Sequence, residues 1–206
     1  MNKRNYQLEL DKVIEGLADK TPTLLLHSCC APCSSYVIEY LSQFFSITVL
    51  YYNPNIAPQA EYAKRALEQQ RFIGEFPAKN RVGFIEGDYA PNDFFSCVNG
   101  FEDEPEGGAR CHRCYKLRLE ATAKIAKAQG FDCFASTLSI SPLKSADKLN
   151  EIGEQLQTEY GVVWLPNDFK KREGFKRSIE LSKMYELYRQ NYCGCVYSNS
   201  HKPLSD

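Results

Sequence analysis

The stretch "TLLLHSCCAPCSSYV", residues 23–37, joins an apolar run to a cysteine-rich loop and then to a helical pattern. Residues 23–27 predict a buried strand, because a short apolar run bounded by turn signals suits a strand that is covered on both faces. Residues 34–45 predict a helix that turns its apolar side chains toward the core. A strand that passes through a tight loop into a helix is the basic unit of an α/β fold.

The same alternation of strand and helix continues along most of the chain. Further strands are predicted at residues 47–52, 81–87, 131–137 and 161–166. Helices are predicted at about residues 6–18, 59–76, 91–98, 114–129, 144–160 and 173–190. This order predicts a mostly parallel sheet of about five strands with helices on both faces. Because no linker or repeat interrupts it, we expect a single α/β domain over residues 1–206, with a short polar tail at about 198–206.

Three loops are expected to meet at one edge of this sheet. Cys29 comes two residues after the first strand, residues 53–58 come just after the second strand, and residues 136–142 come just after the fourth strand. In parallel sheets, ligands bind beyond the carboxyl ends of the strands. We therefore predict that these three loops line a common crevice.

The composition narrows the class of protein. The 206 residues are 43% apolar and 25% charged, as in ordinary soluble globular chains. No run approaches the roughly 20 apolar residues of a membrane span, and the first residues lack the apolar segment of a signal peptide. We therefore expect a cytoplasmic protein with no membrane partner, whose nine cysteines are mostly reduced. Many reduced cysteines favour metal or redox chemistry over structural disulfides.

Seven of the nine cysteines fall into three tight groups, whereas Cys97 and Cys133 lie among large apolar residues and are predicted core residues. The groups are Cys29/Cys30/Cys33, Cys111/Cys114 and Cys193/Cys195. A single C-x-x-C pair is compatible with zinc, a redox pair or an iron–sulfur cluster, and three groups on one fold strengthen the case for a metal centre. Structural zinc and iron–sulfur clusters both take four ligands. Seven thiols therefore leave three for other chemistry.

The sequence "CGC", residues 193–195, has two interpretations. One glycine between two cysteines lets the sulfurs meet in a short, strained ring that is easily reduced, which favours a redox-active pair. Alternatively, the pair supplies two further metal ligands. His27 and His112 adjoin cysteine groups, and each is interpreted as a neighbour of the centre and not as a ligand.

Positive charge is concentrated in the second half of the chain. Residues 1–109 carry nine Lys/Arg and fifteen Asp/Glu, whereas residues 110–206 carry sixteen and eleven. The run "KKREGFKR", residues 170–177, is a candidate contact for nucleic-acid phosphates. The competing interpretation is the solvated start of a helix.

Five segments, taken together, resemble one known family. They are "HSCCAPC" (27–33), "YYNPNIAPQAEYAKR" (51–65), "RCHRCYKLRLEATAKIAK" (110–127), "STLSISP" (136–142) and "YRQNYCGCVYS" (188–198). In this order and spacing they are similar to the epoxyqueuosine reductases of the QueH type. The resemblance implies a Rossmann-like (HUP-like) fold and a cytosolic iron–sulfur oxidoreductase that acts on tRNA. The implied reaction is the last step of queuosine biosynthesis, in which epoxyqueuosine at the wobble position loses its epoxide oxygen by two-electron reduction.

The resemblance also implies cofactors and roles for the cysteines. The implied ligands of a [4Fe-4S] cluster are Cys29, Cys30, Cys111 and Cys114. The implied redox-active pair is Cys193 and Cys195. Cys33 is left for an additional iron or zinc ion beside the cluster. Since each turnover consumes two electrons, the resemblance also implies an electron donor, which the sequence does not identify.

Residues in or near the predicted crevice are candidate contacts for the tRNA. They are Tyr52, Asn53, Asn55, Tyr115, Lys170, Lys171 and Arg172, with Tyr51 as a further stacking candidate. Aromatic side chains stack on the splayed bases of RNA loops, although each tyrosine also suits simple packing. The asparagines suit either substrate binding or turn formation. The loop "STLSISPLKS", residues 136–145, is richer in serine than is usual in the family.

Three other functions fit parts of the pattern. A zinc-stabilised RNA-binding module would use the cysteines without redox chemistry. An ATP-dependent tRNA-modifying enzyme would want a glycine-rich phosphate loop after the first strand, whereas "HSCCAPCSS", residues 27–35, contains no glycine. A simple thiol–disulfide oxidoreductase would not need the cysteines at 29, 30, 111 and 114 together.

Overall fold

The computed structural model describes residues 4–198, so the polar tail predicted beyond residue 198, with His201, lies outside the described residues. The strands are β1 (Thr23–His27), β2 (Ser46–Tyr51), β3 (Val82–Glu86), β4 (Cys133–Ser136) and β5 (Val163–Trp164). The helices are α1 (Tyr6–Glu15), α2 (Ala31–Leu41), α3 (Gln59–Glu75), α4 (Pro91–Val98), α5 (Ala109–Gln129), α6 (Ala146–Tyr160) and α7 (Gly174–Met184), with a 3-10 turn, η1 (Thr137–Ile140). Within the described part of the chain, no helix is long and apolar enough to cross a membrane.

The five strands form one sheet in the order β3-β2-β1-β4-β5, and every neighbouring pair is parallel. The predicted α/β architecture is therefore confirmed. From β1 the chain winds outward through β2 and β3, and then returns to place β4 on the other side of β1. At the carboxyl ends of β1 and β4, the loops that follow these two strands turn away from each other. Such a point is a topological switch point, and ligands bind there in open α/β sheets. The cysteine doublet directly follows β1 and lies at this switch point.

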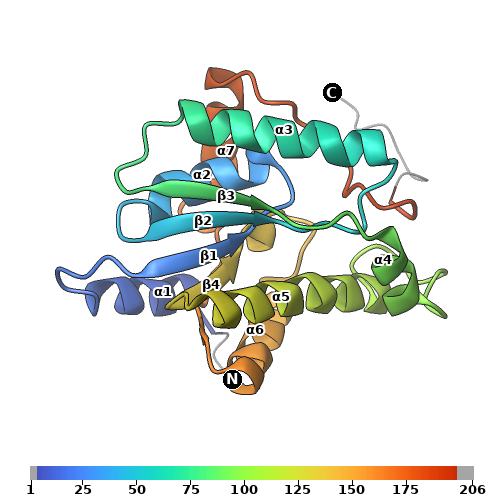
Figure 1. Cartoon of the computed structure of the whole chain (residues 1–206), viewed down its shortest axis with the longest axis horizontal. Helices are drawn as coiled ribbons and strands as arrows, with labels where there is room; N and C mark the ends of the chain where they lie inside the picture. The colour runs from blue at the N-terminus through green and yellow to red at the C-terminus, as the bar shows by residue number, and fades with distance from the viewer. Residues whose placement is uncertain (1–3, 199–206) are drawn as a thin grey trace.

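Helices cover both faces of the sheet, as the sequence predicts. Side chains alternate along each strand, so Leu24 and Leu26 of β1 pack with residues of α1, α2 and α3 on one face. Leu25 packs on the other face with residues of α5 and α6. Figure 1 shows α3 above the sheet and α5 below it. The core is therefore divided into two layers, and the edge between them carries the loops of the candidate site.

Helix α5 begins at Ala109, five residues before the predicted start at residue 114. The carboxylate of Glu104 accepts a hydrogen bond from the Ala109 backbone N–H at 3.2 Å. This contact satisfies one of the unpaired donors at the helix N-terminus and places negative charge beside it. As a result, Cys111 and Cys114 lie within the first turns of the helix and not ahead of it.

Helix α7 ends at Met184, although the sequence predicts a helix that continues to about residue 190. Glu186 adopts a left-handed backbone conformation with φ 49°. The Leu187 N–H then donates to the Ser182 carbonyl at 2.8 Å, which closes the last turn. The predicted helix is wrong beyond residue 184, because a left-handed residue ends a helix even where the composition favours its continuation.

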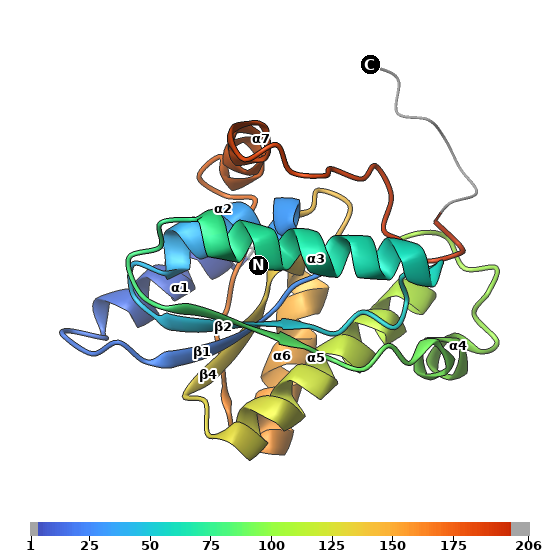
Figure 2. The same cartoon turned by 45° about the horizontal axis from the view of Figure 1, so that its top comes forward.

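The segment after α7 runs along α3 toward α4 and the start of α5 (Figure 2). Three contacts fix its course. Arg71 donates to the Tyr185 carbonyl at 2.9 Å, the Tyr188 hydroxyl donates to Glu61 at 3.1 Å, and the Ala57 N–H donates to the Gly194 carbonyl at 2.9 Å. The segment thereby carries the third cysteine group back to the first two.

Candidate active site

The first cysteine group occupies the loop between β1 and α2. The sulfurs of Cys29, Cys30 and Cys33 all lie within 4.8 Å of one another, and the first two are 3.8 Å apart. Cys29 and Cys30 are buried. Hydrogen bonds from Cys30 and Cys33 hold the pKa of Cys29 well below its usual value. The group therefore favours one thiolate, which is the form that binds metals.

Neighbouring side chains hold this loop from behind. The Asn53 amide donates to the Ser28 carbonyl at 2.8 Å, and the Ser28 hydroxyl donates to Gln69 at 2.9 Å. His27 is fully buried, with Nδ1 2.9 Å from the Ser136 hydroxyl. Burial, together with the charge of Arg118, lowers the pKa of His27 to about 3. His27 is thus a neutral residue that ties β1 to β4.

The second group lies on one side of α5, since residues three apart in a helix are neighbours. Cys114 is buried, and burial raises its pKa to about 12. The Cys111 sulfur accepts a hydrogen bond from the Gly107 N–H at 3.2 Å. A backbone donor of this kind fixes the position of the sulfur and orients it as a ligand.

The third group is shaped by Gly194, whose φ of 105° is in the region that favours glycine. A Cβ at this position would lie 3.0 Å from Ile56 and 3.1 Å from the Arg65 guanidinium. Arg65 also donates to the Cys193 carbonyl at 3.2 Å. A hydrogen bond from Cys195 lowers the pKa of Cys193 well below its usual value. The two thiols therefore face each other, and Cys193 is the more acidic.

The three groups meet around two adjoining cavities. The larger, about 310 Å³, has Cys29, Cys33 and Cys193 in its wall. The smaller is lined by Cys111, Cys114, Cys193 and Cys195 with Asn55, Tyr115 and Arg118. Cys193 belongs to both cavities. The structure therefore brings residues that are 164 positions apart in sequence into one centre.

In the described part of the chain, four basic side chains line these walls, among them Arg118 and Lys144. Arg118 is 1% exposed and lines the smaller cavity. Lys144 lines the larger one. Although burial opposes it, the negative charges of Cys193 and Cys29 raise the pKa of the Lys144 amine. Both side chains are therefore cations directed at the thiol groups.

The predicted aromatic and amide contacts are divided between the cavity and the core. Asn55 and Tyr115 line the smaller cavity. Asn53 is fully buried and holds the doublet loop, as described above. The Tyr52 hydroxyl donates to Asp93 at 3.0 Å, and the Tyr51 hydroxyl donates to the Tyr62 carbonyl at 3.0 Å.

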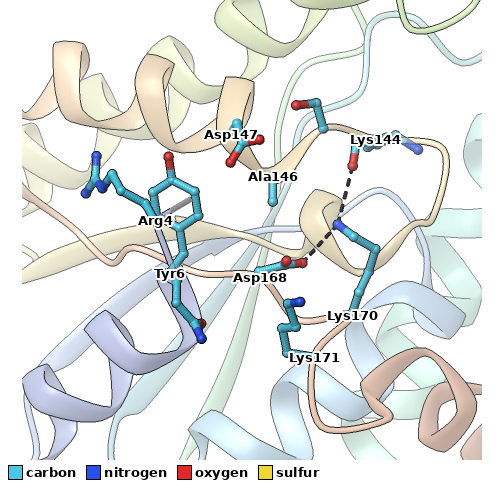
Figure 3. Close-up of a pocket in the computed structure, with 10 residues that line it drawn as sticks. Arg4, Tyr6, Lys144, Ala146, Asp147, Asp168, Lys170 and Lys171 are labelled. Carbon is cyan, nitrogen blue, oxygen red and sulfur yellow. Dashed lines mark hydrogen bonds and ion pairs between the residues drawn. The ribbon is translucent and has the colours of Figure 1, made fainter. Parts of the chain in front are cut away.

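Two of the predicted basic contacts, Lys170 and Lys171, line a separate pocket near the start of α6 (Figure 3). The Lys170 ammonium is held by Asp168 at 2.9 Å and by the Lys144 carbonyl at 3.4 Å. Lys171 lines the same pocket and is exposed. Arg172 pairs with Asp11 at 2.6 Å. Because Lys144 lines both this pocket and the larger cysteine cavity, the two adjoin each other.

Sequence reasoning missed Arg118 and Lys144 as site residues. Arg118 follows Cys114 by one helical turn, so once α5 is assigned, it is predicted on the cysteine face. Lys144 gives a weaker signal, since it stands alone in a serine-rich loop. Glu106 also lines the larger cavity and comes from the acidic loop ahead of α5.

Comparison with known proteins extends the likeness beyond the cysteines. The model of the epoxyqueuosine reductase QueH family matches residues 24–201. Epoxyqueuosine reductase QueH of Streptococcus pyogenes is 47% identical over 202 residues, covering 94% of this chain and 79% of the relative. That of Thermotoga maritima is 35% identical over 181 residues, covering 85% and 90%.

A solved structure shares the fold. The U34-tRNA thiolase NcsA from Methanococcus maripaludis, determined with its [4Fe-4S] cluster, superposes with a TM-score of 0.53 at 13% identity, over 94% of this chain and 67% of that chain. This likeness concerns the arrangement of helices and strands. The sequence matches run across nearly the whole chain and not only through the cysteine motifs, and the protein therefore belongs to the QueH family of epoxyqueuosine reductases.

Proposed function

We propose that this oxidoreductase of queuosine biosynthesis removes the epoxide oxygen of epoxyqueuosine, at the wobble position of tRNA, in the cavity where its cysteines converge. The observation that carries the proposal is that Cys193 lines both cavities, beside thiols of the other two groups. A dithiol and a metal centre held at one place are the parts that a two-electron reduction fed by single electrons needs.

The residues present fit a [4Fe-4S] cluster, which takes four thiolate ligands. We assign these ligands to Cys29, Cys30, Cys111 and Cys114. The Asn55 side chain is 2% exposed and lines the smaller cavity, yet neither of its polar atoms has a hydrogen-bond partner among residues 4–198. An orphaned buried amide fits a site whose acceptors are the sulfurs of a cofactor. When bound, the cluster would supply single-electron transfer and a Lewis-acidic iron near the epoxide.

Cys33 is available for an additional iron or zinc ion. Its sulfur lies within 4.8 Å of those of Cys29 and Cys30 and faces the larger cavity. Cys33 thus suits a separate ion at the cavity wall, beside the cluster that the doublet would help to hold.

The dithiol balances the reaction. Conversion of the epoxide to an alkene takes up two electrons and two protons and releases one water. Cys193 and Cys195 supply both electrons when their sulfurs join as a disulfide. Because the lowered pKa makes Cys193 a thiolate, Cys195 supplies one proton and water supplies the other. Cys193 lines the larger cavity, so it faces the substrate, and Cys195 closes the disulfide from the buried side. A one-electron donor protein then returns two electrons, and Cys195 regains its proton from water.

The larger cavity suits the modified base. Its volume of about 310 Å³ lies at the lower end of the roughly 300–1,000 Å³ that small-molecule sites occupy, which fits one nucleobase turned out of the anticodon loop. The Lys144 ammonium lines this cavity and would stabilise negative charge that develops on the epoxide oxygen. The adjoining pocket with Lys170 and Lys171 would hold a neighbouring phosphate. We place the reaction in the cytoplasm, where tRNA and reduced thiols occur together.

An activity assay tests this function. The anaerobically purified chain, with dithionite as the electron source, is incubated with an anticodon stem-loop RNA carrying epoxyqueuosine. Digestion to nucleosides and mass spectrometry should show a product lighter by one oxygen atom, in amounts exceeding one per chain. A cluster-loaded, reduced protein that leaves the epoxide unchanged would contradict the proposal, and ATP-dependent conversion would support the rival tRNA-modifying enzyme.

A further inference from the structure

Arg118 carries a buried positive charge that no carboxylate in the described part of the chain neutralises. The side chain is 1% exposed. Among residues 4–198, no carboxylate pairs with it, and the groups that act on its charge most strongly are Cys114, Cys193 and Cys29. A buried charge is costly unless a charge of opposite sign accompanies it. The partner of this guanidinium therefore belongs to the thiol centre.

The guanidinium is held in place by the centre's own framework. Its Nε donates to the Cys114 carbonyl one turn back along α5 at 3.2 Å, and its Nη1 approaches the Asn53 Oδ1 at 3.5 Å. The same Asn53 amide holds the doublet loop through the Ser28 carbonyl. The remaining nitrogen, Nη2, is buried without a hydrogen-bond partner in the described part of the chain. Arg118 is thus fixed between two cysteine groups with one donor left over.

The position of the Arg118 charge would affect how readily a cluster bound at this site accepts an electron. Arg118 lines the smaller cavity together with four cysteines. An oxidised cubane cluster with four thiolates carries a net negative charge, and each added electron increases that charge. A fixed cation inside the low-dielectric interior stabilises the reduced form more than the oxidised one. Hydrogen bonds to the sulfurs act in the same direction.

We propose that Arg118 is the counter-charge of the cluster and raises its reduction potential, so that a one-electron donor can reduce it. This inference rests on the proposed [4Fe-4S] cluster and goes beyond its ligands. Arg118 is a positioning and electrostatic residue and not one that contacts the substrate. Arg65, another buried arginine near the centre, does not take this role, because Glu61 pairs with it at 2.7 Å. Arg110 is also buried and lines the smaller cavity, but its Nη1 donates to the backbone carbonyls of Glu102 and Glu104.

The test is a redox titration of the cluster-loaded protein, followed by electron paramagnetic resonance of the reduced cluster. In R118M, the reduction potential of the cluster should shift to a more negative value, because no guanidinium charge then offsets the negative charge of the added electron. In R118K, which keeps the charge, the shift should be smaller. K116M removes an exposed charge from the same helix, and its potential should match that of the unchanged chain, because water and salt screen surface charges.

A second readout is the rate at which an iron chelator removes the cluster, which should rise in R118M and remain unchanged in K116M. An unshifted potential in loaded R118M would overturn the inference. R118Q is the substitute if R118M does not load. Loading of R118K but of neither neutral variant would support the counter-charge role, and failure of all three would show a structural role and overturn it. An unchanged chain that takes up no cluster would instead refute the proposed function.

Discussion

Anaerobically purified C111S protein is expected to retain less than roughly a tenth of the iron and sulfide bound by the unchanged chain. Even substitution of residues behind a ligand lowers metal affinity about 10- to 100-fold, so loss of a ligand should cost at least that. The serine oxygen is a poor replacement for a thiolate on iron. The serine oxygen would instead accept the hydrogen bond that the Gly107 N–H now donates to the Cys111 sulfur at 3.2 Å. Iron and acid-labile sulfide per chain, with the visible absorption spectrum, measure the result.

C97S is the matched control for this experiment. Cys97 packs against the small cluster that contains Phe94, Val98 and Cys114, so it is close to the centre and meets similar surroundings. It lies in neither cysteine cavity. C97S protein should therefore bind iron as the unchanged chain does. Full iron in C111S, or loss of iron in C97S, would contradict the assignment of the ligands.

C195S protein is expected to keep the cluster and to lose at least roughly a hundredfold in turnover, as enzymes do when one member of a reacting pair is removed. A serine cannot form the disulfide that stores two electrons, so each epoxide would have to be reduced without the dithiol. The substitution should fold, because serine is nearly isosteric. The Cys195 carbonyl is held by the Ser198 N–H at 3.1 Å and its hydroxyl at 2.9 Å, and neither bond involves the thiol.

Two measurements on the same sample decide the role of this pair. Iron content shows whether Cys195 is a ligand, and nucleoside mass spectrometry shows whether the epoxide is reduced. Brown, inactive C195S protein supports the redox role. Colourless C195S protein would assign the pair to metal binding, and brown protein with full turnover would remove the disulfide from the reaction.

The order of strands and helices could be predicted from the sequence because it depends on local patterns. Residues 23–27 are apolar and bounded by turn signals, and they form β1 at the predicted positions. Because all the strands are parallel, the loops that follow them are expected to meet at one edge of the sheet. Prediction was less accurate at helix ends, because the position of a helix end depends on a single side chain or a single backbone angle. Helix α5 begins earlier than predicted, where the Glu104 carboxylate accepts a hydrogen bond from its first backbone N–H. Helix α7 ends earlier than predicted, because Glu186 adopts a left-handed conformation.

The cysteines of the candidate site were visible in the sequence, whereas its charges were not. Cysteine groups carry their own signal, since few structural roles need them so close together. Arg118 in sequence resembles any surface arginine of an amphipathic helix, and only the packed structure shows that it is buried and without a carboxylate. Conversely, the basic run at 170–177 is conspicuous in sequence, but Lys170 is partly committed to Asp168.

Iron and sulfide analysis of the unchanged chain, purified without oxygen, tests the central claim most directly. The account predicts brown protein with about four irons and four acid-labile sulfides per chain, as one cubane cluster requires. Iron in excess of sulfide would be the sign of the additional ion at Cys33. Colourless protein that holds zinc, even after attempted cluster reconstitution, would contradict the account and favour a zinc-stabilised RNA-binding module.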